Sequence, residues 1–253
     1  MWNEIIKTFP LVAAASFILD AFIGDPRWLP HPVRLMGRVI SRFDGKFNNE
    51  SYNNSARFFA GALFSLCFTI FTGVISGALL FVLFTVDFRL GILGEIIMST
   101  YCLAAHDLIK HAMNVYNCRY NLDEARIAVG MIVGRETGKL SDQGVIKATV
   151  ESIAESTCDG VIAPAFYILL FGPVGGMVYK AVNTMDSMIG YHNEKYEYYG
   201  KPAAIADDIL NFIPSRISAM CIITASAMIR GMDHMGAFRI WRRDRYNHKS
   251  PNS

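Results

Sequence analysis

The feature that most constrains this chain is a long apolar run in its first third. Phe58–Val86 comprises 29 residues without one charged side chain. A helix needs about 20 predominantly apolar residues to cross the hydrocarbon core of a bilayer. The run therefore predicts a transmembrane helix, and the rest of the fold has to be compatible with a membrane.

Four further segments are apolar enough to enter a membrane but are shorter or interrupted: Thr8–Leu19, Leu90–Ala105, Gly160–Tyr179 and Ile217–Ile229. The chain is 52% hydrophobic and 18% charged, whereas charged residues make up about a quarter of a soluble domain. No segment alternates apolar and polar residues as a half-buried strand does. We therefore predict an all-α, polytopic integral membrane protein with about four to five membrane helices. A cleavable signal peptide is the alternative for the first segment, although its apolar run continues past "AAAS" into Asp20.

The segment Gly160–Tyr179 allows two topologies, because "GPVGG" at 172–176 interrupts it. Residues 161–171 would form about 16 Å of helix, half the thickness of a bilayer. A re-entrant hairpin would keep the polar residues before and after it in one compartment, and it requires that Ile209–Ile229 does not cross. A single kinked span would place Lys180–Asp208 on the other side. The sequence leaves both topologies open.

Basic residues concentrate in two segments, 25–57 and 230–253. Basic segments beside apolar spans remain cytosolic, so we expect both to face the cytosol from the cell inner membrane, with Phe58–Val86 and Leu90–Ala105 as an out-and-back pair between them. The basic tail could also suggest nucleic acid, but there is no basic platform interleaved with aromatic residues, so we favour a membrane surface and expect no nucleic-acid partner. The five cysteines have neither zinc-site spacing nor a close pair, and we interpret them as small apolar fillers.

We expect residues 1–253 to form one membrane-embedded catalytic domain. Its parts are a first apolar helix (8–24), a charged motif with a polar linker (25–57), a membrane helix pair (58–106), a cytosolic helical segment (107–159), broken membrane helices with polar motifs (160–229) and a basic cytosolic tail (230–253). In the cytosolic segment, Asp123–Val133 and Ser141–Ser156 predict helices. Ser141 is the expected N-cap of the second helix, and Gly134 and Gly160 are expected helix ends.

A first candidate cluster lies in "VESIAESTCDG". Glu151 and Glu155 are four residues apart and share a helix face with Lys147, and Asp159 follows. Such carboxylates could hold Mg²⁺ or transfer protons. The alternative is a solvated face with ordinary ion pairs between residues four apart.

Two further polar motifs follow. In "YKAVNTMDSMIGYHNEKY" the side chains of Tyr179, Asn183 and Asp186 align with Gly190 on one helical stripe, and a polar stripe at a membrane edge indicates function. In "DDILNFIPSR", Asp208 and Asn211 are three residues apart and could contact one ligand. Asp207 could instead be a helix N-cap. The stretch "GRETGKLS" does not qualify as a phosphate loop, because its spacing is one residue short and Leu140 occupies the Ser/Thr position.

Five blocks of the sequence carry a family resemblance. They are "LDAFIGDPRWLPHPVRLMGRVI", "ARIAVGMIVGRET", "VESIAESTCDGVIAPAFYILLFGPVGGMVYKAVNTMDSMIGYHNEKY", "ADDILNFIPSRISA" and "HKSPNS". In this order they resemble the adenosylcobinamide-phosphate synthase family of cobalamin (vitamin B12) biosynthesis. The chain departs from the family pattern at His192, where an Arg or Lys commonly stands. It also ends at Ser253, before the Gly-rich segment and further apolar helix with which the family continues.

The resemblance implies an integral membrane ligase that uses ATP, with Mg²⁺, to join aminopropanol or its O-phosphate to adenosylcobyric acid. Membrane lipid and other membrane enzymes of late cobalamin assembly are the further partners expected. A non-catalytic membrane sensor of the same superfamily and a membrane transporter are the alternatives. In the first block, prolines and arginines suit a stiff wall for an anionic substrate.

Site residues are carried over from the matched blocks, and we expect them to converge on one cytosolic cavity. The catalytic candidates are Glu151, Glu155, Asp159, Asp186, Glu194 and Asp208. The substrate- or nucleotide-binding candidates are Asp25, Arg27, His31, Arg34, Lys180, Asn183, Asn193, Lys195, Asn211 and Arg216. The Mg²⁺ candidates are Glu151, Glu155 and Asp186.

Overall fold

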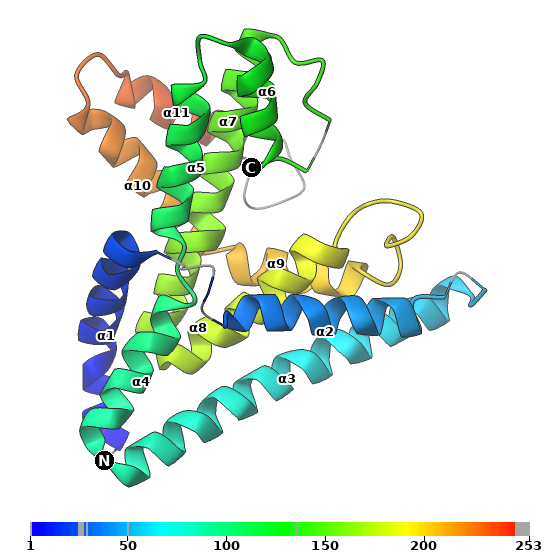
Figure 1. The fold of residues 1–253 in the computed structure, drawn as a ribbon, viewed down its shortest axis with the longest axis vertical. Coiled ribbons are helices and arrows are strands. Elements are labelled where there is room, and N and C mark those ends of the chain that lie inside the picture. The colour runs from blue at the N-terminus through cyan, green and yellow to red at the C-terminus, as the bar shows by residue number, and fades with distance from the viewer. Residues whose placement is uncertain (1, 25–27, 29, 50, 135, 246–253) are drawn as a thin grey trace.

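The computed structural model describes residues 2–24, 28, 30–49, 51–134 and 136–245. These residues form α-helices, one π-helical turn and no strand, which confirms the all-α prediction (Figure 1). The elements are α1 (Trp2–Ile23), α2 (Pro32–Phe47), α3 (Asn54–Val86), α4 (Phe88–Thr100), α5 (Ala105–Asn117), α6 (Leu122–Gly130), α7 (Asp142–Thr157), η1 (Cys158–Ile162), α8 (Ala163–Ile189), α9 (Lys201–Asn211), α10 (Pro214–Met228) and α11 (His234–Asp244).

Within the described residues, 4 helices are long and apolar enough to cross a membrane, or up to 5 if the bent pair α9 and α10 counts as one span. The prediction of a polytopic protein is thereby confirmed. The 29-residue apolar run lies inside α3, which begins at Asn54 because the Asn53 side chain accepts a hydrogen bond from Ala56 N at 2.7 Å. Asp87 then ends α3 and caps α4 through Arg89 N at 2.7 Å. The predicted out-and-back pair is therefore α3 and α4, which pack against each other.

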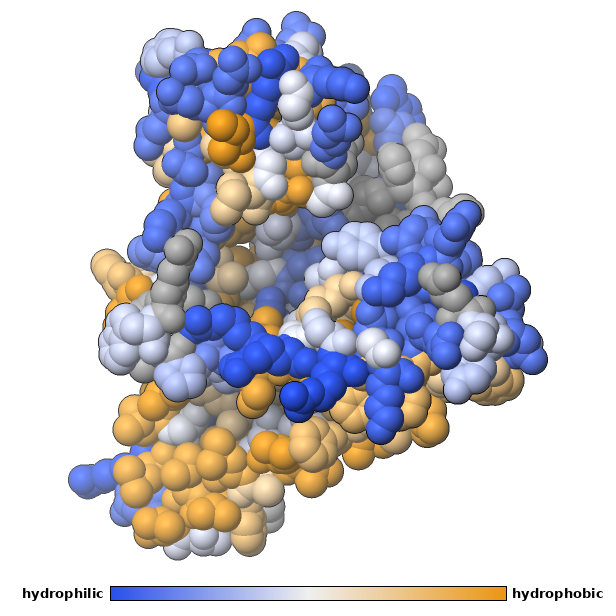
Figure 2. Space-filling model, turned by 45° about the vertical axis from the view of Figure 1, so that its right-hand side comes forward, coloured by the Kyte–Doolittle hydropathy of each residue, from blue (hydrophilic) through white to orange (hydrophobic). Residues whose placement is uncertain are grey.

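The molecule has an apolar half and a polar half. In Figure 1, α1, α4 and the lower parts of α3 and α8 form one half, and α5, α6, α7, α10 and α11 form the other. Figure 2 shows the first half as mainly hydrophobic and the second as mainly hydrophilic on the visible face. Helix α3 exposes large apolar side chains along its length, among them Leu63, Ile70 and Phe81, as a lipid-facing helix does.

Helix α8 folds back on itself at Gly172. Gly172 has a φ of 68° and a ψ of −168°, and Pro173 follows it. A side chain at this φ is strained, so glycine suits the turn. Tyr167 and Tyr179, on either side of the turn, stack with ring centroids 5.2 Å apart. A straight helix would separate residues twelve apart by about 18 Å. The segment therefore folds back as a hairpin. Whether this hairpin re-enters on one side of a membrane stays a prediction.

The polar helices differ in part from the prediction. Ser141 is the N-cap of α7, as expected, and accepts a hydrogen bond from Gly144 N at 3.2 Å. Helix α6 ends at Gly130, before the predicted Val133 and Gly134. The prediction that a helix ends at Gly160 was wrong. Gly160 lies inside the π-helical turn η1, which joins α7 to α8 without a break. A π turn adds one residue to the helical repeat, so the chain changes the direction of its side chains while its backbone hydrogen bonds continue.

Candidate functional site

A cavity of about 550 Å³ opens where the polar helices meet the hairpin. Its walls come from α5, α7, η1, the second arm of α8 and the loop after α6. Five of the predicted site residues line it: Glu155, Asp159, Lys180, Asn183 and Asp186. The hairpin produces this arrangement, because Asp159 and Asn183 lie on opposite sides of the turn at Gly172 and still share a hydrogen bond.

Lys180 is a cation among several cavity carboxylates. Asp159 is attracted to Lys180 and accepts a hydrogen bond from the Asn183 amide. Asp186 is repelled by Asp207, Asp208 and Glu155. Carboxylates gathered beside a single lysine leave a negative field, which favours a cationic ligand or an anion that arrives with a divalent cation.

Behind the cavity, Asp207 is the centre of a buried hydrogen-bond network. Its carboxylate accepts from Asn183 Nδ2 at 3.4 Å and from Asn211 Nδ2 at 2.8 Å. Asn211 Oδ1 in turn accepts from the Tyr179 hydroxyl at 3.0 Å. Asp207 is 4% exposed and Asn211 0%. Asp208 is half-buried beside Asp207, so the network joins the "DDILNFIPSR" motif to the cavity wall.

The interpretation of Asp207 as a helix N-cap was wrong. Helix α9 begins at Lys201 and its N-cap position is Gly200, so Asp207 lies in the helix interior. The sequence did contain an indication that Asp207 lies inside a helix. Asp207 and Asn211 are four residues apart, which puts both on one helix face. The spacing of three residues between Asp208 and Asn211 had instead indicated Asp208 as the partner of Asn211.

The cavity also contains residues that the sequence analysis did not select. Asp107 and His111 lie on the α5 wall, one helical turn apart. Ser152 and Ser156 lie on the α7 wall. The i,i+4 spacing of Asp107 and His111 was visible in the sequence, but nothing in the sequence showed that α5 would pack against α7.

Glu151 does not line this cavity, although it lies one turn before Glu155. Its side chain is exposed and forms an ion pair with Lys147 at 3.7 Å. In the part of the chain that the structure describes, no group of three or more His, Cys, Asp and Glu side chains could hold a metal ion. The Mg²⁺ site of Glu151, Glu155 and Asp186 therefore stays a prediction, and Glu155 and Asp186 are the two of its members that share the cavity.

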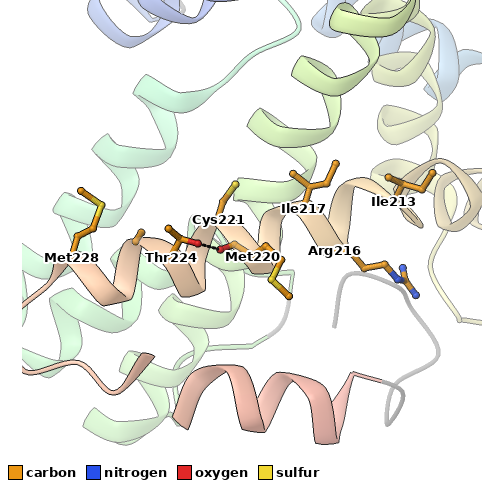
Figure 3. A pocket seen from close by; sticks show the side chains of 8 residues that line it. Ile213, Arg216, Ile217, Met220, Cys221, Thr224 and Met228 are labelled. Carbon is orange, nitrogen blue, oxygen red and sulfur yellow. Dashed lines mark hydrogen bonds between the residues drawn. The ribbon is translucent and has the colours of Figure 1, made fainter. Parts of the chain in front are cut away.

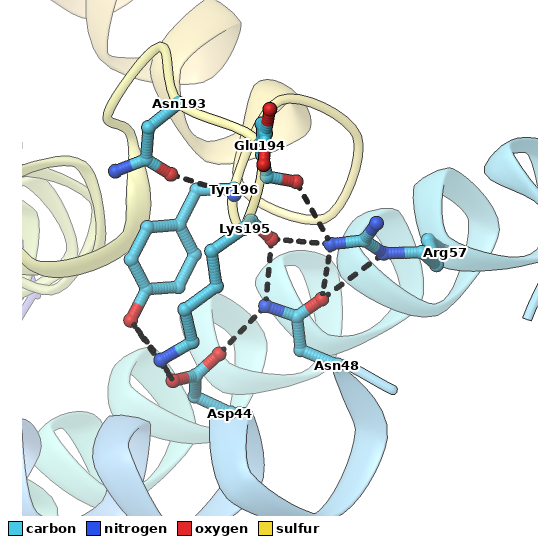
Figure 4. A network of polar contacts seen from close by, with 7 residues as sticks. All are labelled: Asp44, Asn48, Arg57, Asn193, Glu194, Lys195 and Tyr196. Atoms are coloured by element: carbon cyan, nitrogen blue, oxygen red, sulfur yellow. Dashed lines mark hydrogen bonds and ion pairs between the residues drawn. The ribbon is translucent and has the colours of Figure 1, made fainter. Parts of the chain in front are cut away.

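The loop 190–200 is held on α2 and α3 by a second polar network, shown in Figure 4. Lys195 Nζ donates to Asp44 Oδ2 at 2.9 Å and to the Tyr196 hydroxyl at 2.7 Å. The hydrogen bonds to Tyr196 and Asp44 raise the pKa of the Lys195 ammonium above its ordinary value. Arg57 donates to the carbonyl oxygens of Glu194 and Lys195 and to Asn48 Oδ1.

This loop network gives three predicted site residues a structural position. Lys195 and the Glu194 carbonyl anchor the loop, and Asn193 Oδ1 accepts from Tyr196 N at 3.0 Å. None of the three lines the cavity, whereas Gly190 and Tyr191 at the start of the same loop do. Gly61 of α3 permits the close contact, because a Cβ atom there would lie 1.9 Å from Tyr199 O.

The first motif block contributes mainly to helix termini. His31 is the N-cap of α2, its Nδ1 accepting from Val33 N at 3.2 Å, and its ring meets the Tyr101 ring at a centroid distance of 5.0 Å. Arg34 is exposed in the first turn of α2. Asp20 is buried and accepts a hydrogen bond from Ala105 N at 2.6 Å at the start of α5. Asp25 and Arg27 lie outside the described residues.

Arg216 lies at a separate, apolar pocket. This pocket of about 630 Å³ follows one face of α10 from Ile213 to Met228 (Figure 3). The Arg216 guanidinium stacks on the Phe212 ring, 3.7 Å from its centroid. The pocket shares no residue with the polar cavity, so Arg216 is not brought to the predicted site.

The comparisons with known proteins agree with the five sequence blocks. Residues 13–253 match the family model described as "CobD/Cbib protein". The chain is 41% identical over 244 residues to a cobalamin biosynthesis protein CobD of Listeria monocytogenes, covering 96% of this chain and 77% of the relative. It is 36% identical over 250 residues to the CobD protein of Pelobacter propionicus, covering 98% of this chain and 76% of that protein. No solved structure matches. The chain therefore belongs to the CobD/Cbib family of cobalamin biosynthesis proteins.

Proposed function

We propose that this protein is an ATP-dependent amide ligase that joins aminopropanol, or its O-phosphate, to a propionate carboxylate of adenosylcobyric acid. The observation that carries the proposal is the cavity in which Lys180 lies among Glu155, Asp159 and Asp186. Family membership supports the pathway, and the cavity supplies groups for phosphoryl transfer and amine binding. An acidic cavity attracts the ammonium form of the amine, and a lysine stabilises charge on a transferring phosphoryl group.

In the first step, ATP would transfer its terminal phosphoryl group to the propionate, which gives an acyl phosphate and releases ADP. In the second step, the amine nitrogen would attack the acyl carbon and displace phosphate, and the nitrogen would lose a proton as the amide forms. The protein has to bring three reactants together and exclude water from the activated carboxyl group. Lys180 would stabilise the developing phosphate charge. Asp159 would orient Lys180, since the two attract each other. Asn183 would orient Asp159 through their hydrogen bond.

The donor set fits a magnesium–nucleotide complex better than a preformed metal site. Mg²⁺ usually keeps several waters and takes one or two protein carboxylates together with substrate phosphates. Glu155 of α7 and Asp186 of α8 both line the cavity and repel each other, so a divalent cation between them would relieve that repulsion. These two residues would hold the ion, which would neutralise phosphate charge when bound.

The size of the cavity limits what can enter it. At about 550 Å³ it is in the range of small-molecule sites. The amine and the phosphate end of a nucleotide would occupy it, and the much larger corrin ring would lie across its mouth with only the reacting propionate inside. We place this mouth on the cytosolic side of the cell inner membrane, because the basic segments 25–57 and 230–253 lie beside apolar spans and such segments remain cytosolic. Partner enzymes of late cobalamin assembly would meet the protein there.

Complementation of a bacterial strain blocked at aminopropanol attachment tests the proposal. The wild-type gene should restore growth without added cobinamide, and Glu155→Gln and Asp186→Asn should lower ligation at least a hundredfold. Asp142→Asn is the matched control, because this exposed acidic residue lies at the far end of α7. Membrane-extracted protein should show equal amounts and equal melting temperatures for all variants.

Two outcomes would reject the ligase. One is no complementation by a full-length version, extended by the C-terminal segment with which the family continues, that is present in the membrane. The other is uptake of labelled corrinoid into vesicles containing the protein without product formation, which would favour a transporter.

A further inference from the structure

Helix α2 carries three longitudinal stripes of different chemistry. The basic stripe comprises Arg34, Arg38, Arg42 and Lys46. The apolar stripe comprises Leu35, Val39, Phe43 and Phe47. The buried stripe comprises Met36, Ile40 and Asp44. Each set repeats every fourth residue, which advances about 40° around a helix of 3.6 residues per turn, so each remains on one side over the length of α2.

The three stripes point in different directions. At about 100° per residue, the middle of the basic stripe lies about 180° from the middle of the buried stripe, and the apolar stripe lies between them. The buried stripe packs against the protein, where Met36 and Ile40 join the core with α3 and α8. All four members of the basic stripe are exposed. The helix therefore directs at least Arg38, Arg42 and Lys46 away from the protein.

The apolar stripe lies on the side of the membrane helix. The Phe43 ring stacks on Phe64 of α3 with centroids 5.2 Å apart, and on Phe47 at 5.6 Å. Leu35 is nevertheless 57% exposed and Phe43 and Phe47 are each 39% exposed. The protein thus leaves an apolar edge of α2 uncovered next to the apolar surface of α3.

The orientation of α2 matches that of an interfacial helix. In Figure 1, α2 runs across the direction of α1 and lies above the lower part of α3. In Figure 2, a hydrophilic band crosses the middle of the molecule directly above the hydrophobic half. An amphipathic helix at a membrane surface has this form, with its apolar side among the acyl chains and its basic side at the headgroups.

We propose that α2 is a docking surface for anionic phospholipid headgroups, with the basic stripe on the phosphates and the apolar stripe in the adjoining acyl chains. Arginine forks bind phosphate oxygens in bidentate fashion, which suits a row of three arginines. The cytosolic leaflet is negatively charged and attracts basic segments beside membrane helices. The helix would seat the protein at a defined depth and hold the loop 190–200, which α2 anchors through Asp44. The proposal does not depend on the ligase chemistry.

The test compares two triple variants in detergent micelles doped with phosphatidylglycerol or with phosphatidylcholine of the same chains. Arg38→Gln, Arg42→Gln and Lys46→Gln remove three charges from α2 and leave Arg34, a candidate substrate residue, in place. Arg239→Gln, Arg242→Gln and Arg243→Gln remove the same number from α11, which lies in the polar half. The readout is the melting temperature as a function of lipid fraction.

Phosphatidylglycerol should stabilise the wild type and the α11 variant more than phosphatidylcholine does. The α2 variant should need at least tenfold more phosphatidylglycerol for half of this effect, since each basic residue near an anionic surface contributes about fivefold. Its melting temperature in phosphatidylcholine should equal that of the wild type, because the three residues are exposed. Inorganic phosphate at the same concentration should not replace the lipid.

Two results would overturn the proposal. The α2 variant could keep its full response to phosphatidylglycerol. Inorganic phosphate could reproduce the lipid effect, which would make the ligand a free anion.

Discussion

Asn211 illustrates how single buried residues tie the polar motifs together. Its amide group donates to Asp207 and accepts from Tyr179, so both of its polar atoms are satisfied although the residue is 0% exposed. A buried carboxylate such as Asp207 requires such partners, because an unpaired charge in a low-dielectric interior is strongly unfavourable. The buried polar groups of "DDILNFIPSR" therefore stabilise the fold by satisfying one another, in addition to supporting the cavity wall through Asn183.

We predict that Asn211→Ala destabilises the protein by about 2–4 kcal/mol, because it leaves Asp207 and the Tyr179 hydroxyl each short of one buried hydrogen bond. Tyr179→Phe, which removes only one hydroxyl, should cost about 1 kcal/mol. Thermal unfolding of the purified variants in detergent measures both. Equal melting temperatures for Asn211→Ala and wild type would show that water or a rearranged side chain satisfies Asp207.

At the scale of elements, the hairpin of α8 brings distant parts of the sequence together. The turn at Gly172 packs against α1, where a Cβ atom on Gly172 would lie 2.6 Å from the Phe9 ring. The stacked pair Tyr167 and Tyr179 closes the hairpin above the turn. Because the two arms are antiparallel, Lys180, Asn183 and Asp186 reach the level of Asp159 at the opposite end from the turn.

Gly172→Ala should therefore destabilise the hairpin by about 2 kcal/mol or more, because its φ of 68° and ψ of −168° lie in a region that is essentially restricted to glycine and costs about 1–3 kcal/mol for other residues, and because the new Cβ atom would contact Phe9. Gly77→Ala is the matched control, because this glycine of α3 has open space around the position of a Cβ atom and alanine favours a helix. Melting temperatures in detergent compare the two. Adding Phe9→Ala to Gly172→Ala should recover the part of the lost stability that comes from contact with the Phe9 ring. No recovery would mean that backbone strain alone lowers the stability.

Much of the element structure could be predicted, because it follows from local chemistry. The uncharged run of α3, the Ser141 cap and the break at Gly172 and Pro173 are each determined by neighbouring residues, but the fold-back at that break is not, so the sequence left a hairpin and a kinked span both open. The place of Gly160 could not be predicted, because the local sequence does not distinguish a glycine at a helix end from a glycine inside a π turn. The separation of Lys195 and Glu194 from the cavity could not be foreseen, because it depends on Arg57 and Asp44, more than a hundred residues earlier in the chain.

At the scale of the whole molecule, the polar motifs lie on one side of an apolar half. The loop before α7 and the start of α9 flank the hairpin in sequence, and the hairpin returns the chain to the side from which it came (Figure 1). The turn between α3 and α4 lies at the opposite end of the molecule. The same arrangement keeps α2 and α11, the basic elements that the structure describes, on the side of the cavity.

This arrangement predicts the sidedness of three single cysteines, placed in a background in which the five native cysteines are alanine. Lys139→Cys before α7 and Lys201→Cys at the start of α9 are exposed positions on either side of the hairpin. Neither should react with a membrane-impermeant maleimide in intact cells, and both should react after the cells are opened. Arg89→Cys, at the exposed turn between α3 and α4, should react from outside. Opposite behaviour of Lys139→Cys and Lys201→Cys would mean that α8 crosses the membrane as a single kinked span, and reaction of both from outside would keep the hairpin and reverse the orientation.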